Sequence, residues 1–536
     1  MDGWINIVRF VLFAAAVVAF SSEKLGLPLG ANLCRRTHAH NCVRFQQQRI
    51  FTLRNSMKPS MTDDSDTSNE SDSPVILLVG VCVLDRLLSV ASNPAPDAKI
   101  RTTSYNEEGG GNSANTASAI GKLLDAKLVR SPSKKASLQE GKPIRVCLLS
   151  KVGDDAVGQQ LSEELNASNV ETSSQLFRRV GSTAFTTIIV SEKEQSRTCI
   201  FTPGSCGELS IADDVQSLSL EEIDELFKNV IHLHSDSRHT DVALWLAKEA
   251  KKRGGITISC DCEKDRNTKA LDELIEVCDI LFTSSNQLGG YIERLTSERE
   301  AANGRAPLPE PTITVNKKTV VSTARTNTTT SQLIQTYIES LAPSMYFARW
   351  QRELAMGKEV VVTHGSMGCL HYKQTESSTL SSASKNDKHT WASATNASGG
   401  PHNAIDIEMD NTNNSIARIR HSFGDGNEAS NVVYEVHQAG VLKDAKIVDT
   451  TGAGDAFIGG YILVSNLALE AEEEEMIGGR VQFSLEVGSF VGGTKLGGSG
   501  ARSALPTGRD FDKLGTNAAD AKISLQDLLG CFNDAQ

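Results

Sequence analysis

Apolar segments alternate with helix-length segments through the middle of this 536-residue chain. The run PVILLVGVCVL, residues 74–84, is apolar on both faces, as strands of a parallel sheet are, because helices cover both sides of such a sheet. Further strands are predicted at 144–150, 229–234, 256–262, 278–283 and 359–363, and helices at 115–124, 156–165, 240–252 and 267–277. This alternation forms βαβ units, so the sequence predicts an α/β fold with a mostly parallel central sheet.

Three stretches do not follow this alternation. Residues 183–203 have two β-rich halves around a polar centre, which is the pattern of a β-hairpin. Residues 303–335 contain APLPEP and then a Thr/Ser/Asn-rich tract, and residues 374–430 are rich in Ser, Asn, Thr, His and Gly. Because neither of these two stretches can bury enough apolar surface to offset its ordering entropy, we expect both to be disordered surface insertions.

The first 74 residues are predicted to be a targeting leader and a disordered acidic linker. Residues 10–20 (FVLFAAAVVAF) form an apolar run of signal-peptide length, and the basic stretch after it, up to Lys58, holds Glu23 as its one acid. Residues 61–73 are acidic and small. This order resembles the bipartite plastid-targeting leaders of algae with secondary plastids. A plain secretory signal or a short buried helix, with a secretory or cytoplasmic destination, stays open.

The charge balance and the cysteines limit the partners and the compartment. The chain has 54 Lys and Arg against 66 Asp and Glu, a net charge of −12, and a protein that coats nucleic acid normally has the opposite sign. No apolar run reaches the ~20 residues that a membrane span needs, so we expect no stable span in the mature chain. Several of the eleven cysteines, such as Cys147 and Cys278, stand in apolar runs, which favours buried thiols and a reducing compartment.

Residues 447–465 (IVDTTGAGDAFIGGYILVS) carry the most chemical information. A turn of small residues between an apolar start and a helical run places Gly452, Ala453 and Gly454 at a helix N-terminus. Free N–H groups there form an anion site that a phosphate can approach without meeting a side chain. Asp455 follows in the first helical turn, where a carboxylate suits the removal of a proton from a hydroxyl that attacks phosphorus. The alternative is an ordinary helix start with an acidic first turn.

The motif DTTGAGD, residues 449–455, resembles the C-terminal signature of the ribokinase-like, or pfkB-type, carbohydrate kinases. Other family motifs match in the same order: GVCVLD with Gly80 and Asp85, GGGNSAN at 109–115, VGDDAVG at 152–158, VVTHGSMGCL at 361–370 and GGSGARSALPT at 497–507. The chain looks most similar to ketohexokinase-like members and to plant and algal pfkB proteins.

The resemblance implies a three-layer α/β/α kinase domain with a mostly parallel central sheet. This domain would cover residues 75–512, and a tail of residues 513–536 would follow it. A small β-sheet lid would form from residues 98–109 and 183–203 and close over the sugar. Because members commonly pair through their lids, the resemblance also implies a homodimer.

The resemblance further assigns a role to each matching residue. Asp455 would be the general base, and Gly452, Ala453 and Gly454 would form the anion hole for the phosphoryl group. The sugar would be held by Asp85, Gly111, Asn112 and Asn115, whose carboxylate and amide groups suit vicinal hydroxyls on their own chemistry. The nucleotide would contact Asn286, Thr363, Gly365, Gly368 and Gly500. ATP and Mg²⁺ would be required, and a monovalent cation such as K⁺ would bind near Asp449 and Thr451.

Two features of the polar residues complicate the metal assignment. Many family members carry an Asn-x-x-Glu motif that orders water around Mg²⁺, but here Gly289 stands in place of the glutamate that would follow Asn286. Asp261, from the neighbouring strand, is a candidate substitute. Separately, His232, His234, Asp236 and His239 have a spacing that could bind zinc. No cysteine pair accompanies them, so we expect a strand-end loop instead.

The sequence therefore favours an enzyme that transfers the γ-phosphoryl group of ATP to a hydroxyl of a small sugar, a ketose or a related compound. A nucleoside acceptor on the same fold is a second hypothesis, because the hairpin offers Phe185 and Phe201 for stacking on a base. A catalytically silent regulator or scaffold is a third, supported by the missing glutamate and the long insertions.

Overall fold

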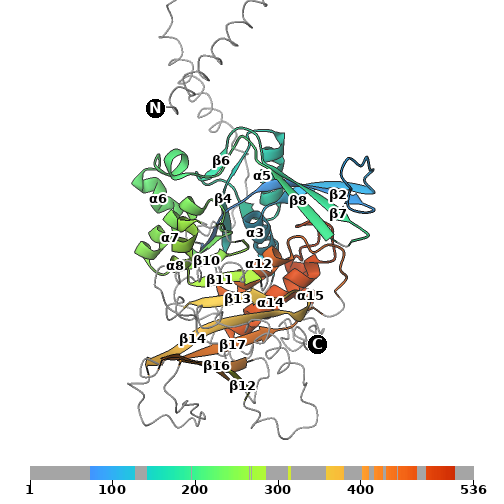
Figure 1. The fold of residues 1–536 in the computed structure, drawn as a ribbon. Coiled ribbons are helices and arrows are strands. Elements are labelled where there is room, and N and C mark those ends of the chain that lie inside the picture. The colour runs from blue at the N-terminus through green and yellow to red at the C-terminus, as the bar shows by residue number, and fades with distance from the viewer. Residues whose placement is uncertain are drawn as a thin grey trace, which may run out of the picture. The chain divides into compact units, whose positions relative to one another are not determined.

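The structure is a computed structural model (Figure 1). It describes residues 73–126, 142–284 apart from 195, 265 and 267, 312–315, 358–379, 401–409, 416–425, 430–442, 445–467 and 479–513. Residues 1–72 of the predicted leader and 514–536 of the predicted tail lie outside these ranges. The plastid destination therefore stays a prediction from the sequence. Across the described ranges, no helix is long and apolar enough to cross a membrane.

A 13-stranded sheet runs through the centre of the fold. Seven neighbouring strands are parallel, in the order β13-β11-β10-β9-β1-β4-β5. Their bounds are β1 Val75–Val79, β4 Arg145–Val152, β5 Val170–Glu171, β9 Val230–Ser235, β10 Thr257–Asp261, β11 Ile280–Ser284 and β13 Glu359–Thr363, and β6 Phe177–Arg179 pairs with β4. The predicted α/β fold with a mostly parallel sheet is thus confirmed.

Helices cover both faces of this sheet, which makes three layers. Leu77 and Val79 of β1 belong to the hydrophobic core on one face, with residues of α7 and α8, while Ile76 and Leu78 belong to the core on the other face, with residues of α3, α5, α12 and α14. The helices are α3 Asn112–Leu123, α5 Ala156–Ala167, α6 Leu220–Leu226, α7 Thr240–Arg253, α8 Lys269–Val277, α12 Ala453–Ser465, α14 Arg480–Lys495 and α15 Gly508–Lys513. Apolar side chains on both faces of β1 explain why its sequence does not alternate.

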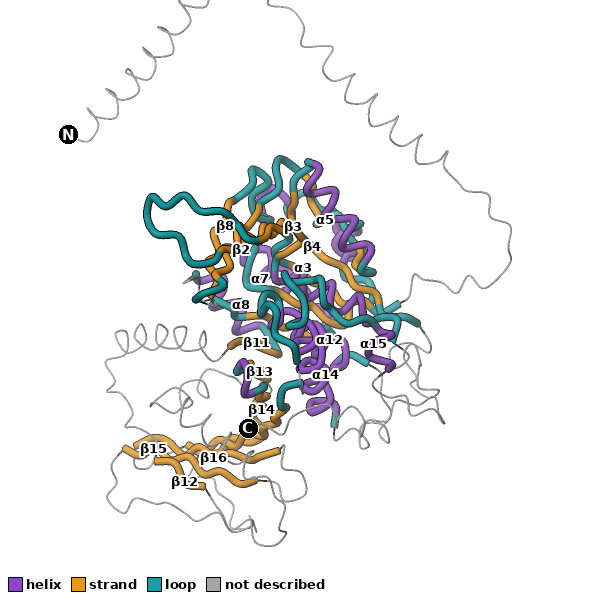
Figure 2. The backbone as a smooth tube through the Cα atoms, turned by 90° about the vertical axis from the view of Figure 1, so that its right-hand side faces the viewer, coloured by secondary structure: helices purple, strands orange, loops and turns teal. Residues whose placement is uncertain are grey.

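Glycines bring α12 close to both of its helical neighbours (Figure 2). A Cβ atom added to Gly459 would lie 2.8 Å from the Cβ of Ala119 in α3, and one added to Gly460 would lie 3.0 Å from the carbonyl oxygen of Val487 in α14. Only glycine permits such approach of main chains. This packing places the start of α12 beside the start of α3.

A second, four-stranded sheet has the order β3-β2-β7-β8. Its strands are β2 Val83–Val90, β3 Ser104–Gly110, β7 Phe185–Ser191 and β8 Ser196–Thr202. The predicted hairpin and small sheet are present, but residues 74–84 are not one strand. The chain leaves the central sheet after Val79 and enters the small sheet at Val83, so Asp85 stands on the small sheet. The homodimer through this sheet stays a prediction.

The carboxylate of Asp236, just after β9, holds the point where the chain leaves the central sheet. Asp236 is 1% exposed, and its Oδ2 accepts hydrogen bonds from the N–H groups of Val81 at 2.8 Å and Ser113 at 3.0 Å. A Cβ atom on Gly80 would collide with this carboxylate. One buried side chain thus ties β9 to the β1–β2 connection and to the N-terminus of α3.

The histidines near Asp236 are structural. Ser259 Oγ lies 2.7 Å from His232 Nε2 and 2.8 Å from His234 Nδ1, and His239 Nδ1 accepts the N–H of Leu209 at 3.1 Å. Burial lowers the pKa of His232 to about 4 and that of His234 to about 3, so both are neutral at pH 7. In the described part of the chain no three or more His, Cys, Asp or Glu side chains are grouped to hold a metal ion.

The prediction that residues 374–430 are a disordered insertion is wrong for much of this segment. It contains the end of β14 (Cys369–Thr379), all of β15 (Pro401–Met409) and β16 (Ile416–Asp425), and the start of β17 (Ser430–Ala439), which extend the central sheet with antiparallel pairs. Within 303–335, residues Thr312–Val315 form β12, which pairs with β15. The average composition of each stretch concealed short alternations such as AIDI and IARI.

Replacement of Asp236 tests its structural role. Asp236→Ala removes the acceptor of three main-chain N–H groups, those of Val81, Ser113 and Arg238, so we expect the free energy of unfolding to fall by about 2–5 kcal/mol. The control is Asp241→Ala, an exposed carboxylate in the first turn of α7, which should cost at most ~1 kcal/mol. Urea unfolding followed by circular dichroism measures both, and equal losses would contradict the assignment.

Candidate active site

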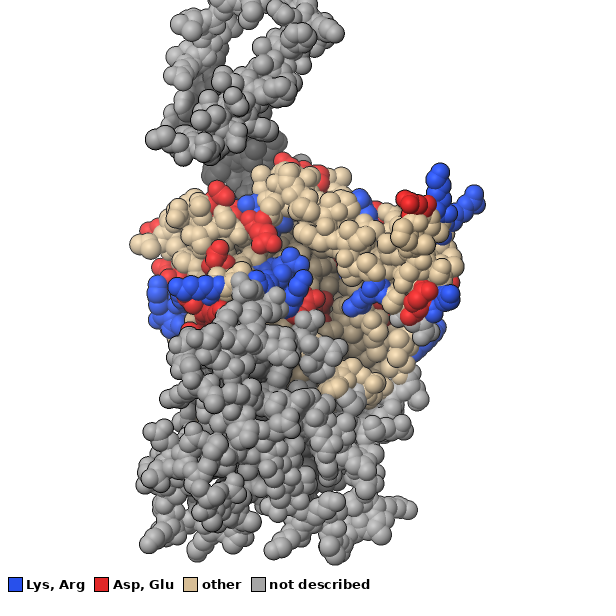
Figure 3. Space-filling view, viewed as in Figure 1, with Lys and Arg blue, Asp and Glu red and all other residues tan. Residues whose placement is uncertain are grey.

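A cavity of about 440 Å³ lies where the carboxyl ends of the central strands face the small sheet. Figure 3 shows a hollow on this face, with acidic and basic side chains at its edge. Open α/β sheets bind ligands at these strand ends. The predicted site residues that line the cavity are Asp85, Gly111, Asn112, Asn115, Thr363, Thr451, Gly452, Gly454 and Asp455.

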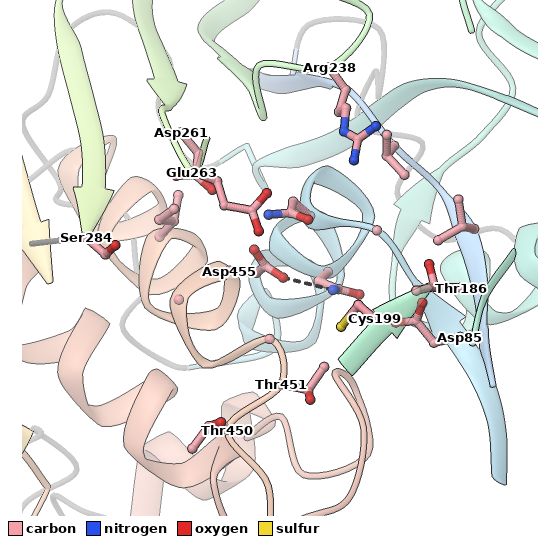
Figure 4. A pocket seen from close by; sticks show the side chains of 18 of the residues that line it. Asp85, Thr186, Cys199, Arg238, Asp261, Glu263, Ser284, Thr450, Thr451 and Asp455 are labelled. Atoms are coloured by element: carbon pink, nitrogen blue, oxygen red, sulfur yellow. Dashed lines mark hydrogen bonds between the residues drawn. The ribbon is translucent and has the colours of Figure 1, made fainter. Parts of the chain in front are cut away.

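Asp455 is a buried carboxyl group in the first turn of α12 that faces this cavity (Figure 4). Its side chain is 8% exposed, and its Oδ2 accepts a hydrogen bond from Asn115 Nδ2 at 2.8 Å. Burial, together with the charges of Glu263, Asp236 and Asp85, raises the pKa of Asp455 to about 7, although the hydrogen bond from Asn115 opposes the shift. The group can therefore exchange a proton near neutral pH.

Arg502 fixes the orientation of Asn115, and the sequence analysis missed it. Its Nε donates to Asn115 Oδ1 at 2.9 Å and its NH2 nitrogen donates to the carbonyl oxygen of Gly110 at 2.8 Å. With its oxygen bonded to Arg502, the Asn115 amide presents its NH₂ group to Asp455. The sequence analysis places Gly500 of the same 497–507 segment at the nucleotide and gives no role to Arg502, which is 7% exposed.

The glycines of the turn before α12 have different neighbours. Gly452 has φ +73°, and a Cβ atom there would lie 2.8 Å from the Cβ of Ala501, so this position requires glycine. A Cβ atom on Gly454 would meet nothing within 4 Å, which leaves open space above it. The N–H of Ala453 donates to the carbonyl oxygen of Thr450 at 3.3 Å, so this predicted anion-hole amide is already used inside the turn.

Asp85 faces the cavity from the small sheet. It is 6% exposed, and burial raises its pKa to about 6, against the opposing effects of Arg502 and of a hydrogen bond with Thr186. Gly110 leaves the room for this carboxylate, and Gly111, at φ +95°, starts α3 against the carbonyl oxygen of Val81. Asp85 and the start of α3 thus present acceptors and donors to the same space.

Two further carboxylates line the cavity beside Asp455. Figure 4 shows Asp261, at the end of β10, and Glu263 directed toward the same space. Burial and the charges of Glu263 and Asp455 raise the pKa of Asp261 well above its usual value. A divalent cation would relieve this repulsion, and Mg²⁺ commonly binds with one or two carboxylates together with substrate phosphates. These residues therefore fit Mg²⁺, and Glu263 was not predicted.

Two arginines add positive charge to the cavity. Arg197 of β8 donates from NH1 to Thr451 Oγ1 at 2.9 Å and to Thr450 Oγ1 at 3.4 Å, so the small sheet contacts the glycine turn. Arg238, after β9, lines the cavity as well. Neither arginine was predicted as a site residue.

Four of the predicted nucleotide and cation residues lie apart from the cavity lining. Gly365 is the first residue of the 3₁₀ turn after β13 and Gly368 directly follows this turn. A fifth predicted residue, Asn286, lies outside the described residues. Gly500 donates its N–H to Asp449 Oδ2 at 2.7 Å. The other carboxylate oxygen of Asp449 accepts the N–H and hydroxyl of Thr451 at 2.9 and 2.8 Å. Both carboxylate oxygens of Asp449 are therefore occupied by donors from the chain.

The raised pKa of Asp455 makes stability depend on pH. In the unfolded chain the group ionises near pH 3.9, and in the folded protein near 7, so the folded state loses stability as pH rises between these values. Asp455→Asn removes the ionisation and keeps an acceptor for Asn115. We expect the stability of the variant relative to wild type to be greater at pH 8 than at pH 5. The difference between the two free energies of unfolding (variant minus wild type) should increase by roughly 2–3 kcal/mol. Urea unfolding at both pH values tests this, and a pH-independent difference would contradict it.

Solved structures similar to this chain share little sequence with it. The ribokinase of Arabidopsis thaliana, complexed with ribose and ATP, is 16% identical, with 85% of this chain and 99% of that chain covered and a TM-score of 0.47. A nucleoside kinase of Methanocaldococcus jannaschii is 15% identical, with 86% of this chain and 99% of that chain covered and a TM-score of 0.44.

Comparisons of the sequence itself identify a relative and a family model. An ATP-dependent ribose-1-phosphate kinase of Halopiger xanaduensis is 26% identical over 223 residues, which are 41% of this chain and 64% of that protein. The chain thus spans less than two thirds of this relative. Residues 75–325 match the model of the pfkB family carbohydrate kinases. Residues 75–325 are therefore similar to the pfkB family of carbohydrate kinases.

Proposed function

We propose that the protein transfers the γ-phosphoryl group of ATP to a hydroxyl group of a small sugar. One observation carries this proposal: the buried carboxyl of Asp455 faces a cavity next to the glycine turn that starts α12. A helix start of this kind holds phosphate oxygens, and the carboxyl beside it serves a group that must lose a proton as it reacts.

In the proposed step, the acceptor hydroxyl donates its proton to Asp455 as its oxygen attacks the γ-phosphorus. The bond between the γ-phosphorus and the β–γ bridging oxygen breaks, and ADP leaves with that electron pair. A base is most useful when its pKa lies near the working pH, and the pKa of about 7 for Asp455 meets this condition. Asn115, held by Arg502, keeps the carboxylate pointed at the cavity.

The backbone and the carboxylates would stabilise the phosphate charge from two sides. The open space above Gly454 lets phosphate oxygens approach the N-terminus of α12, where the helix dipole favours negative charge. Asp261 and Glu263 would hold Mg²⁺, which supplies compensation for the charge on the phosphates when bound.

The polar groups that line the cavity limit the classes of molecule that could be the phosphoryl acceptor. Asp85, Asn112 and Asn115 offer the mixture of acceptors and donors that vicinal hydroxyls require. Arg197 and Arg238 favour a second candidate, a sugar that already carries a phosphate, as in the ribose-1-phosphate kinase relative. Within the sugars, a ketose remains the choice suggested by the ketohexokinase-like motifs.

The two alternatives from the sequence have weaker support. For a nucleoside, Phe201 lines the cavity, whereas Phe185 is not among the lining residues. The guanidinium carbon of Arg86 lies 4.1 Å from the ring centre of Phe185. For a silent regulator, the missing glutamate of the Asn-x-x-Glu motif counts less, because Asp261 and Glu263 bring carboxylates to the cavity.

An acceptor panel with an inactive variant tests the proposal. Purified protein is given ATP, Mg²⁺ and single ketoses, aldoses, sugar phosphates or nucleosides, and ADP formation is measured. We expect turnover with a sugar or sugar phosphate, and Asp455→Asn should lower it at least ~10²-fold with ATP binding nearly intact. Turnover only with nucleosides would favour the second hypothesis, no turnover with any acceptor the third, and an active Asp455→Asn would refute the general base.

A methyl group at position 454 should separate phosphate access from folding. Gly454→Ala adds a Cβ atom that meets nothing, so we expect an unchanged or higher melting temperature, but turnover at least ~10-fold lower because the methyl group occupies the approach to the helix N-terminus. Gly452→Ala is the matched control and should lose about 1–2 kcal/mol of stability from its positive φ. Full turnover by Gly454→Ala would place the phosphate elsewhere.

A further inference from the structure

Lys495, the last residue of α14, is a fully buried lysine behind the glycine turn. Its side chain is 0% exposed, and its Nζ donates to the carbonyl oxygen of Asp449 at 3.0 Å and to that of Gly498 at 3.3 Å. Burying an ammonium group is costly unless fixed acceptors surround it. Burial lowers the pKa of Lys495, while Asp449 and Glu108 act in the opposite direction.

The two carbonyl groups belong to the two segments that shape the turn. Asp449 begins the DTTGAG segment, and Gly498 lies two residues before Gly500, whose N–H binds the Asp449 carboxylate. The N–H groups of Val448 and Asp449 also donate to the carbonyl oxygen of Leu496, at 2.7 and 3.2 Å. Lys495 therefore sits at the junction of these segments, and its charge faces carbonyl oxygens that would otherwise repel each other.

A monovalent cation near Asp449 and Thr451 does not fit this arrangement. A cation site needs several oxygens with free lone pairs, but the carbonyl of Asp449 binds Lys495, and its carboxylate accepts three donors from Thr451 and Gly500. The hydroxyl of Thr451 donates to Asp449 and accepts from Arg197. The K⁺ ligands expected from the family resemblance are thus bonded to groups of the chain itself.

We propose that the ammonium group of Lys495 is a built-in cation that replaces an exchangeable monovalent cation at the glycine turn. It holds the 449–452 segment against the 496–500 segment and keeps the start of α12 aimed at the cavity. Lys495 touches neither the cavity nor a ligand, so it is a positioning residue. The protein should accordingly need no K⁺ at this turn.

The test compares salts at constant ionic strength. Wild-type protein and Lys495→Met are each placed in choline chloride or KCl, and melting temperature and turnover are measured. We expect wild type to have the same melting temperature in both salts and a turnover that differs by less than ~2-fold. Lys495→Met should melt several degrees lower in choline chloride and lose turnover at least ~10-fold, and increasing KCl should restore part of both.

The control is Lys151→Met, which removes a largely buried lysine whose Nζ lies 3.0 Å from Asp214 Oδ2, in β4 rather than at the turn. It should lose stability that KCl does not restore. A wild-type protein that KCl stabilises or activates several-fold would overturn the proposal, and so would a Lys495→Met protein that matches wild type or ignores KCl. If Lys495→Met does not fold, the wild-type salt comparison still decides.

Turnover enters this test only through the proposed function, whereas the melting temperature does not depend on it. Absence of turnover with every acceptor, together with the expected melting pattern, would reject the kinase proposal and leave the role of Lys495 standing. Turnover by wild type that requires KCl would support the kinase proposal and reject the role of Lys495.

Discussion

The buried carboxylate of Asp236 determines how the chain divides between its two sheets. By accepting the N–H groups of Val81 and Ser113, it satisfies main-chain donors at the two places where regular structure is interrupted, the exit from β1 and the start of α3. Two buried amides without acceptors would make this crossing unfavourable. Because the crossing is stable, β2 can carry Asp85 into the small sheet while α3 keeps Asn115 next to α12.

The cavity between the two sheets brings several acidic side chains together, and the positive side chains around it offset their negative charge only in part. Asp85, Asp261 and Asp455 each have a raised pKa, chiefly from burial, and Glu263 adds to the repulsion. Carboxylates in such surroundings take up protons or cations readily, and this is a property of sites that move protons and bind metal-bound phosphates. Arg197 and Arg238 also line the cavity, and their positive charges can pair with anions. The same cavity can therefore hold a magnesium–phosphate group and a polar acceptor.

Local patterns in the sequence predicted the central sheet, its helices and the glycine turn, because strand–helix alternation and a Gly-rich helix start depend on near neighbours. What they missed depends on contacts far apart in the sequence. The break in the 74–84 segment depends on Asp236, 155 residues from Val81, and the role of Arg502 depends on Asn115, 387 residues away. The strands β15 and β16 were missed because a polar average over 374–430 hid their short apolar alternations.

The contact of Arg197 with Thr450 and Thr451 joins the position of the small sheet to the state of the turn. An anion that settles on the helix start would compete with those two hydroxyl groups for the same guanidinium, so one set of hydrogen bonds would be exchanged for another. Anion binding at the start of α12 and movement of the small sheet are then thermodynamically linked. A change that moves β8 away from the turn weakens anion binding, and a bound anion opposes that movement by the same free energy.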